Sequence, residues 1–186
     1  MKLVAILAAV CVLTGCGGPK AITLTEAELA NRLDDQGIEF ISTNWPEPQV
    51  VFPLPKGWTI ASSSERSVHA TRTRAGGPPV SDLTIRIMQD PSILNVRNPH
   101  GESDLKTLSI TRSQGHAVET HFVGPADEYS SEATFAHTAT NVVDGVFLLY
   151  LLRYPESHKS TVPEVLLKIV NETKKEGSNH DLQLTK

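Results

Sequence analysis

The chain has 186 residues, a formal net charge of -4 and a pI near 6.0. This acidic balance argues against a nucleic-acid binder, which would usually present a strongly basic face. The two cysteines are Cys11 and Cys16, so the sequence after Cys16 has no thiol and no disulfide. That part of the chain relies on packing alone, and its length suits one domain that buries about 70% of its unfolded-chain surface.

The first sixteen residues have the features of an export signal. Lys2 is followed by an almost purely apolar run, Leu3–Val12, far shorter than the ~20 residues that span a bilayer as a helix. Together with Leu13-Thr14-Gly15-Cys16, this segment resembles the signal peptide and lipobox of bacterial lipoproteins. The resemblance implies that residues 1–15 are a lipoprotein signal peptide and that the Cys16 thiol receives a lipid anchor that includes palmitate.

The remainder is predicted to be a single domain between short polar ends. Residues 16–21 are expected to be the lipidated cysteine and a tether, residues 22–176 the domain, and residues 177–186 a flexible tail. Gly17, rather than Asp, follows the lipidated cysteine. By analogy with lipoproteins this favours the outer membrane in a bacterium that has two membranes, with the domain outside the cytoplasm.

Two amphipathic helices are predicted. In the first, Thr25 is the N-cap, Glu28 completes a capping box and Gly37 ends the helix. The second begins at Thr161-Val162-Pro163-Glu164, with Pro in the first turn and apolar residues at helical spacing after it. Lys174 and Lys175 are placed at its C-terminal end, where positive charge is favourable, and Gly177 can end it.

Short β-rich runs bounded by turn residues predict a sheet. They lie at 50–52, 58–60, 68–74, 83–87, 118–123, 132–143 and 146–152, whereas 105–112 fits either a helix or a strand with Leu108 and Ile110 inward. Asp144-Gly145 predicts a hairpin turn before the continuously apolar run 146–152, which should be buried on both faces. The predicted fold class is therefore α+β: an antiparallel sheet packed by helices and closed by the C-terminal helix.

The segment Val50-Val51-Phe52-Pro53-Leu54-Pro55-Lys56-Gly57-Trp58 resembles the opening of a Mog1/PsbP-like domain. Such domains begin with a strand, a Pro-x-Gly-Trp-type turn and a second strand, and end with a helix after a long apolar strand. Within that group the chain is most similar to small actinobacterial lipoproteins of the LpqN/LpqT type. In place of the Phe-x-Gly segment of many such domains it has Gln114-Gly115-His116. The resemblance implies a binding or accessory role and transfers no catalytic residue.

No motif predicts catalysis, a cofactor or a metal. The seven histidines form neither His-x-His nor His-Glu-x-x-His, and Gly-x-Ser-x-Gly does not occur. Pro78-Pro79 after Gly76-Gly77 removes the N–H groups that a phosphate cradle needs. The densest polar cluster is interpreted as a solvated loop and consists of Asn98, His100, Glu102 and Asp104.

The sequence therefore predicts a lipid-anchored, non-catalytic binding or accessory module of the bacterial envelope. Its expected partners are the membrane, through Cys16, and an unidentified envelope protein or ligand, but no nucleic acid. Trp45 and Trp58 are expected to cap the core edge, or one of them to line a shallow groove. Two alternatives stay open: a carrier of lipid or small apolar ligands with a pocket between sheet and helix, and a small hydrolase whose site forms only in the fold.

Overall fold

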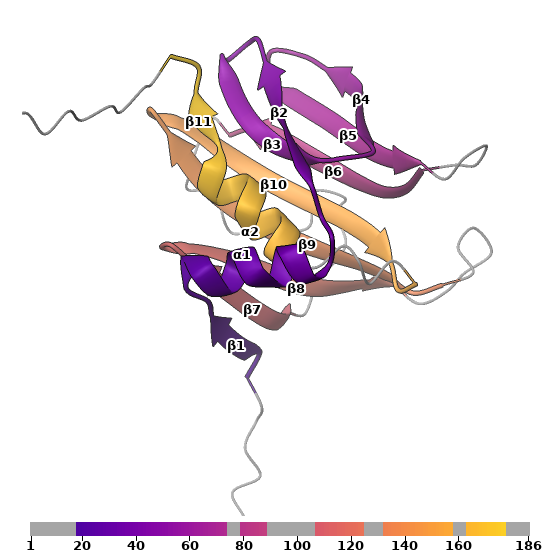
Figure 1. Ribbon diagram of the computed structural model, residues 1–186. Helices are drawn as coiled ribbons and strands as arrows, with labels where there is room; N and C mark the ends of the chain where they lie inside the picture. The colour runs from indigo at the N-terminus through magenta and orange to yellow at the C-terminus, as the bar shows by residue number, and fades with distance from the viewer. Residues whose placement is uncertain (1–17, 74–78, 89–106, 125–131, 158–162, 178–186) are drawn as a thin grey trace, which may run out of the picture.

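The computed structural model describes residues 18–73, 79–88, 107–124, 132–157 and 163–177, which form two sheets and two helices (Figure 1). In spatial order the large sheet contains β1 (Lys20–Thr23), β7 (Thr107–Ser113), β8 (His116–Gly124), β9 (Thr134–Val143), β10 (Val146–Pro155), β6 (Pro79–Ile87), β5 (Ser67–Thr73) and β4 (Trp58–Ser63). The small sheet contains β11 (Lys174–Lys175), β3 (Val50–Pro55) and β2 (Phe40–Trp45). The helices are α1 (Glu26–Asp35) and α2 (Pro163–Glu172).

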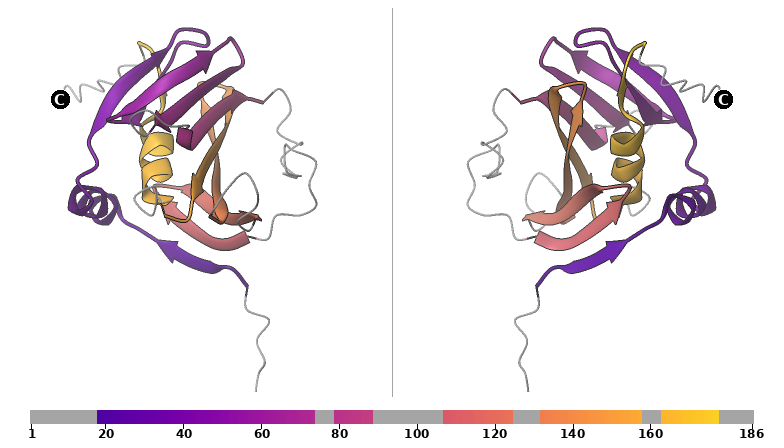
Figure 2. Two further views of the ribbon diagram at one scale, coloured as in Figure 1. Left: turned by 90° about the vertical axis from the view of Figure 1, so that its right-hand side faces the viewer. Right: turned by 90° about the vertical axis from the view of Figure 1, so that its left-hand side faces the viewer.

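The predicted α+β class is wrong. About 60% of the described residues lie in strands and only 16% in helices, so the protein is mainly β. The large sheet is mixed rather than antiparallel, because β1 runs parallel to β7. Each helix has only 10 residues. Moreover, α2 does not form an outer helical layer: it contacts β8, β9 and β10 on one side, and β3 and α1 on others (Figure 2).

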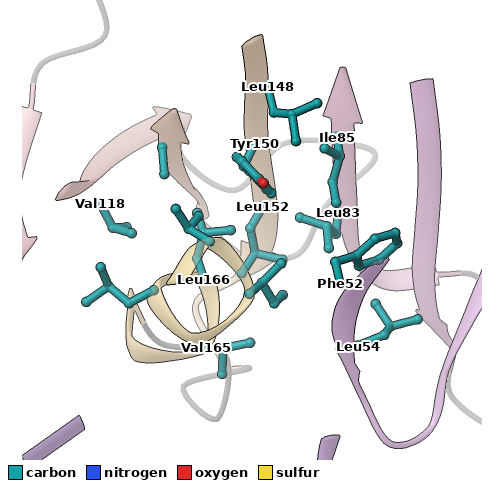
Figure 3. Close-up of a cluster of buried hydrophobic side chains, with 14 of the residues drawn as sticks. Phe52, Leu54, Leu83, Ile85, Val118, Leu148, Tyr150, Leu152, Val165 and Leu166 are labelled. Atoms are coloured by element: carbon teal, nitrogen blue, oxygen red, sulfur yellow. The ribbon is translucent and has the colours of Figure 1, made fainter. Parts of the chain in front are cut away.

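The hydrophobic core surrounds α2. Leu166 and Val170 of α2 are 0% exposed, and they pack in one cluster with side chains of both sheets. Figure 3 shows part of this cluster, and the sheet residues labelled there are Phe52, Leu54, Leu83, Ile85, Val118, Leu148, Tyr150 and Leu152. Side chains therefore occupy the space between the large sheet and α2 that the carrier alternative requires to be open.

The predicted hairpin is present, but the strand after it is fully buried on one face only. Asp144 and Gly145 have φ of 47° and 80°, as a two-residue turn between β9 and β10 requires. Along β10, Leu148 and Leu152 are 0% exposed, whereas Leu149 between them is partly buried. The prediction that residues 146–152 are buried on both faces is therefore wrong, because the face that carries Leu149 is only partly covered.

The first predicted helix is confirmed in detail, and the end of the second is corrected. The hydroxyl of Thr25 accepts from the N–H of Glu28, the Glu28 carboxylate accepts from the N–H of Thr25, and Gly37 has a φ of 63°. The predicted N-cap Thr161 lies outside the described residues. The second helix ends at Glu172, and Lys174–Lys175 pair with β3 as a short strand instead of ending the helix.

Within the ambiguous segment 105–112, the structure describes residues 107–112, which belong to strand β7, and the inward residues of this strand are not the predicted ones. Leu108 is 39% exposed, whereas Thr111 and Ser113 are buried. Thr111 and Ser113 point inward, so alternation along the strand turns Leu108 to the other face, the face of exposed Arg112. The pairing of β7 with β8 is also irregular between Thr107 and Ser109. At the N-terminal end, β1 begins at Lys20, within the stretch predicted to be tether.

Candidate functional site

The turn between β3 and β4 borders a hollow on the surface of the described part of the chain. Its volume is about 250 Å³. The lining residues come from the end of α1, the segment after it, the β3–β4 turn, β5 and α2: Gln36, Gly37, Ile38, Glu39, Pro55, Lys56, Trp58, Arg72 and Val165. The Pro55-Lys56-Gly57-Trp58 segment that carries the family resemblance is thus one wall of the hollow.

Backbone geometry at two turns creates this wall. Gly37 ends α1 with a φ of 63°, and the chain leaves the helix toward Glu39. The N–H of Lys56 donates to the carbonyl oxygen of Glu39 at 2.7 Å, which ties the β3–β4 turn to the segment after α1. Gly57 has a φ of 87°, a conformation that costs little only without a Cβ. The next residue, Trp58, is 7% exposed and packs in the core while its surface contributes to the hollow.

An ion pair stands at the rim of the hollow. Nζ of Lys56 donates to Oε2 of Glu39 at 2.6 Å, and both side chains are about 70% exposed, at 70% and 69%. The hydrogen bond and charge of Lys56 lower the pKa of Glu39, and those of Glu39 raise the pKa of Lys56. Both groups are therefore held in their charged forms at neutral pH. A carboxylate with a lowered pKa is a poor general base, and a lysine with a raised pKa is a poor nucleophile.

The two tryptophans differ in their relation to this site. Trp45 is 1% exposed, and its Nε1 donates to the carbonyl oxygen of Ser64 at 2.7 Å, which joins the small sheet to the β4–β5 turn. It is a core residue. Trp58, in contrast, is both a core residue and part of the hollow. The core interpretation thus applies to both tryptophans, and the groove interpretation applies to Trp58 alone.

The described histidines lie apart from the hollow. Nε2 of His121 is 2.9 Å from the hydroxyl of Thr138, and Nδ1 of His137 is 3.1 Å from that of Thr120. His116 and His121 lie five positions apart on β8, so strand alternation points their side chains to opposite faces. Among the residues that the structure describes, no three His, Cys, Asp or Glu side chains gather in a way that could hold a metal ion.

Two sets of predicted residues lie outside the described ranges: the lipidation residue Cys16, and the polar cluster of Asn98, His100, Glu102 and Asp104. No described helix is both long enough and apolar enough to span a membrane.

Of the residues that line the hollow, sequence reasoning identified Trp58 and the turn before it. It missed Arg72, Gln36 and Val165, which come together only through the pairing of β4 with β5 and the packing of both helices.

The fold and the hollow define a small, two-sheet β protein with a charged-rimmed depression on its surface. No protein-family model matches the sequence, and no curated protein matches it. Its fold is similar to that of LpqN of Mycobacterium tuberculosis, a protein involved in cell envelope biogenesis. The identity is 16% over 84% of this chain and 98% of LpqN, with a TM-score of 0.41.

A protein of Bacteroides thetaiotaomicron is also similar, at 8% identity over 74% of this chain, with a TM-score of 0.48. The match covers 48% of that protein, so this chain corresponds to about half of its length. Because both TM-scores are below 0.5, neither likeness carries an argument about the site or the function. The lipobox and membership of the Mog1/PsbP-like family therefore stay predictions from the sequence.

Proposed function

We propose that this protein is a lipid-anchored binding module of the bacterial cell envelope. In this proposal Cys16 holds the domain on the outer side of a membrane, the outer one where there are two, and the hollow beside Lys56 receives part of another envelope protein without catalysis. The observation that carries the proposal is the convergence of Trp58, Arg72 and the Glu39–Lys56 pair around one depression.

The size of the hollow favours a protein partner over a small-molecule ligand. Sites that enclose drug-sized ligands have volumes of about 300–1,000 Å³. A hollow of about 250 Å³ is smaller and holds one or two side chains of a partner. Such a pocket, with the aromatic side chain of Trp58 in its lining, is a common type of anchor point in protein–protein interfaces.

The charges at the rim support specific docking. Glu39 and Lys56 present opposite charges side by side, and Arg72 adds a guanidinium group on the β5 side. Exposed charges at an interface rim contribute more to the rate and orientation of association than to affinity. Ile38 and Val165, which also line the hollow, would supply apolar contact to the partner.

Two observations support binding over the alternatives of a hydrolase and a carrier. A hydrolase needs groups that exchange protons, whereas Glu39 and Lys56 hold each other in their charged forms, which suits recognition. A carrier would need an apolar cavity under α2, where Leu166 and Leu152 are instead both 0% exposed and belong to one packed cluster.

Photocrosslinking in intact cells tests the binding proposal. A photoreactive amino acid replaces Gln36 or Lys56 at the hollow, and Arg66 in the β4–β5 turn serves as an exposed control. We expect an adduct of the same discrete mass from positions 36 and 56 and none from position 66. In the position-36 variant, Lys56→Glu should remove the adduct and Lys56→Arg should retain it. Equal adducts from position 66, or none from the hollow, would overturn the proposal.

Metabolic labelling with a fatty acid tests the anchor. Wild-type protein and Cys11→Ser should incorporate the label, because Cys11 lies within the predicted signal peptide. Cys16→Ser should not incorporate it and should be uncleaved or released from the membrane fraction, because the thiol is the attachment atom. Unlabelled, wholly soluble wild-type protein would show that the lipid-anchor proposal is wrong.

A further inference from the structure

β2 is an edge strand without the features that usually protect the edge of a sheet. It has six residues, Phe40–Trp45, and none of them is charged, Pro or Gly. Within the described part of the chain, β2 pairs with β3 alone. An exposed edge presents N–H and C=O groups to any other extended chain, and proteins usually block it with charges, proline, a bulge or a very short strand.

The other border strands of the two described sheets each carry such a protective feature. β1 has only four residues and begins with Lys20, and β11 consists of the two lysines Lys174–Lys175. β4 has a bulge between Ile60 and Ser62, which interrupts the regular spacing of its backbone groups. Of these borders, β2 is therefore the one suited to accept a further strand.

The pairing of β2 with β3 shows which backbone groups of β2 point outward. The N–H of Lys56 donates to the carbonyl oxygen of Glu39, so the opposed residues 39 and 56 form a hydrogen-bonded pair. Hydrogen-bonded and non-hydrogen-bonded pairs alternate between antiparallel strands, so every second residue of β2 turns its backbone groups away from β3. The residues whose N–H and C=O groups point away from β3 are Phe40, Ser42 and Asn44.

Two prolines on β3 agree with this assignment. Pro55 is opposite Phe40 and Pro53 is opposite Ser42, and neither proline has an N–H to donate to β2. The side chains of Ser42 and Asn44 are exposed, so this border of β2 is open to solvent. Backbone donors and acceptors that repeat along an extended strand are complementary to one kind of ligand, another extended peptide segment.

Ile41 provides an apolar contact beside this border. Ile41 is opposite Leu54, which is 2% exposed and belongs to the core cluster, so Ile41 lies on the core side of the small sheet. It is nevertheless 50% exposed. Neighbouring side chains on one face of paired strands contact each other, so an apolar residue of an added strand would cover Ile41.

The open border of β2 is continuous with the hollow. Ile38 and Glu39 line the hollow, and the next residue, Phe40, begins β2. Figure 2 shows β2 on the outer side of the small sheet, directly after the chain that leaves α1. A segment that pairs with β2 therefore brings one of its ends to the hollow, where a side chain can enter.

A second copy of this chain fits the border and the hollow less well. After β2 the chain turns back, because the N–H of Gln49 donates to the carbonyl oxygen of Pro46 at 3.0 Å. Trp45, before this turn, is 1% exposed in its own core. Two copies paired antiparallel through β2 would present these residues to each other's hollows, and neither the turn nor the buried indole is available to enter one.

We propose that β2 pairs with an extended segment of the envelope protein that docks in the hollow, so that the partner adds a fourth strand to the three-stranded small sheet. This inference rests on the proposed function and specifies the partner: a segment of alternating apolar and polar residues, whose apolar side chains lie on the face of Ile41. Backbone hydrogen bonds would supply affinity, and the side chain in the hollow would supply specificity.

Photocrosslinking in intact cells tests the strand pairing directly. A photoreactive amino acid replaces Ser42 in one variant and Asn44 in another, and the adducts are compared with that from position 36. We expect the same partner in all three. Peptide mapping should place the crosslinked partner residues for positions 42 and 44 about two residues apart, because paired strands advance equally per residue.

Proline at the outward position provides the matched test. In the position-36 variant, Ser42→Pro removes an outward N–H but no hydrogen bond to β3, so the protein should fold and the adduct should be lost. Ser42→Ala keeps the N–H and should keep the adduct. Melting temperatures show whether both variants fold, and if Ser42→Pro does not, the peptide mapping decides the matter.

The outcomes separate this inference from the docking proposal. If the adduct from position 36 survives in folded Ser42→Pro, or if positions 42 and 44 crosslink without the expected spacing, strand pairing is wrong while docking in the hollow stands. An adduct of twice the mass of this protein would show that a second copy covers β2, which also overturns the inference. The absence of any adduct from positions 36, 42 and 44 would overturn the docking proposal and the strand pairing together.

Discussion

Arg32 of α1 donates a hydrogen bond from Nη1 to Oε1 of Glu164 in the first turn of α2, at 2.9 Å. The two side chains differ in environment: that of Arg32 is 49% exposed, whereas that of Glu164 is only 9% exposed. The contact joins the two helices over 132 positions of sequence. The Glu164 carboxylate is the buried partner and has lost most of its contact with water. It therefore needs the ion pair more than the exposed Arg32 guanidinium does.

Removal of Arg32 should therefore destabilise the fold more than removal of an exposed ion pair. Arg32→Ala leaves a nearly buried carboxylate without its partner, which we expect to lower the free energy of unfolding by about 1–3 kcal/mol. The control is Lys168→Ala, because Lys168 pairs with Glu172 one helical turn away at the surface, and such pairs contribute about 0.3–0.5 kcal/mol. Urea unfolding of both variants measures the difference. Equal losses would show that the helices are not joined as described.

The two faces of β10 should respond differently to truncation. Leu152→Ala removes a side chain that is 0% exposed and leaves a cavity against α2, so we expect a loss of about 2–5 kcal/mol. Leu151→Ala, on the partly buried far face, should cost clearly less, because less apolar surface leaves water on folding. Thermal and urea melts compare the pair. A larger loss at Leu151 than at Leu152 would mean that the strand is inverted.

The fold was predictable where local signals agree with the final environment. The capping box at Thr25, the positive-φ turn at Asp144 and the apolar spacing of α2 are properties of short segments, and each is present. The fold class was not predictable in this way. Residues of β1 are exposed throughout, and in β2 three of the six residues are exposed and only Trp45 is buried, so neither strand shows the alternation that marks a half-buried strand. β1 also pairs in parallel with β7, which is distant in sequence, and no local pattern encodes that pairing.

The site was predictable to a similarly limited degree. Gly57 and Trp58 were recognisable as a turn and an aromatic anchor from their sequence alone. Arg72 reaches the hollow only because β4 and β5 pair with Trp58 opposite Arg72, which depends on register. Leu108 shows the converse case: its apolar side chain was expected inward, but the buried residues of its strand are the polar Thr111 and Ser113, so alternation leaves Leu108 exposed. Which residues converge on a site and which face of a strand is buried are both tertiary properties.

Alkaline pH should weaken the fold through two tyrosines. Burial raises the pKa of Tyr150 to about 12, with the hydroxyl of Thr173 and the amide of Asn141 acting weakly in the other direction, and burial raises that of Tyr154 to about 12 as well. The unfolded chain loses these protons near pH 10, whereas the folded protein keeps them. The stability that the two protonated tyrosines contribute to the fold is therefore fully present below about pH 10 and is lost as the pH rises toward about 12.

Phenolate absorbance and melting temperatures together check this pH dependence. Tyr150→Phe should remove one late-titrating group from the absorbance titration, and its melting temperature should fall less steeply between about pH 10 and pH 12 than that of the wild type. Tyr154→Phe should behave in the same way. Normal titration of both tyrosines near pH 10 in the folded protein would contradict their described burial.

The turn at Gly57 should couple the stability of the fold to the shape of the hollow. Its φ of 87° is strained for any residue with a Cβ, although an added Cβ would meet no atom within 4 Å. Gly57→Ala should therefore cost about 1–2 kcal/mol through backbone strain alone, and Gly57→Asn should cost less because Asn tolerates positive φ.

Gly124→Ala is the matched control: an added Cβ there also meets nothing within 4 Å, but no positive φ is involved, so little change is expected. In the crosslinking assay, Gly57→Ala should weaken the adduct from position 36 more than Gly57→Asn does, because the turn carries Lys56 and Trp58. Equal stability of the alanine variants at 57 and 124 would show that the turn does not have the left-handed conformation from which this wall of the hollow is built.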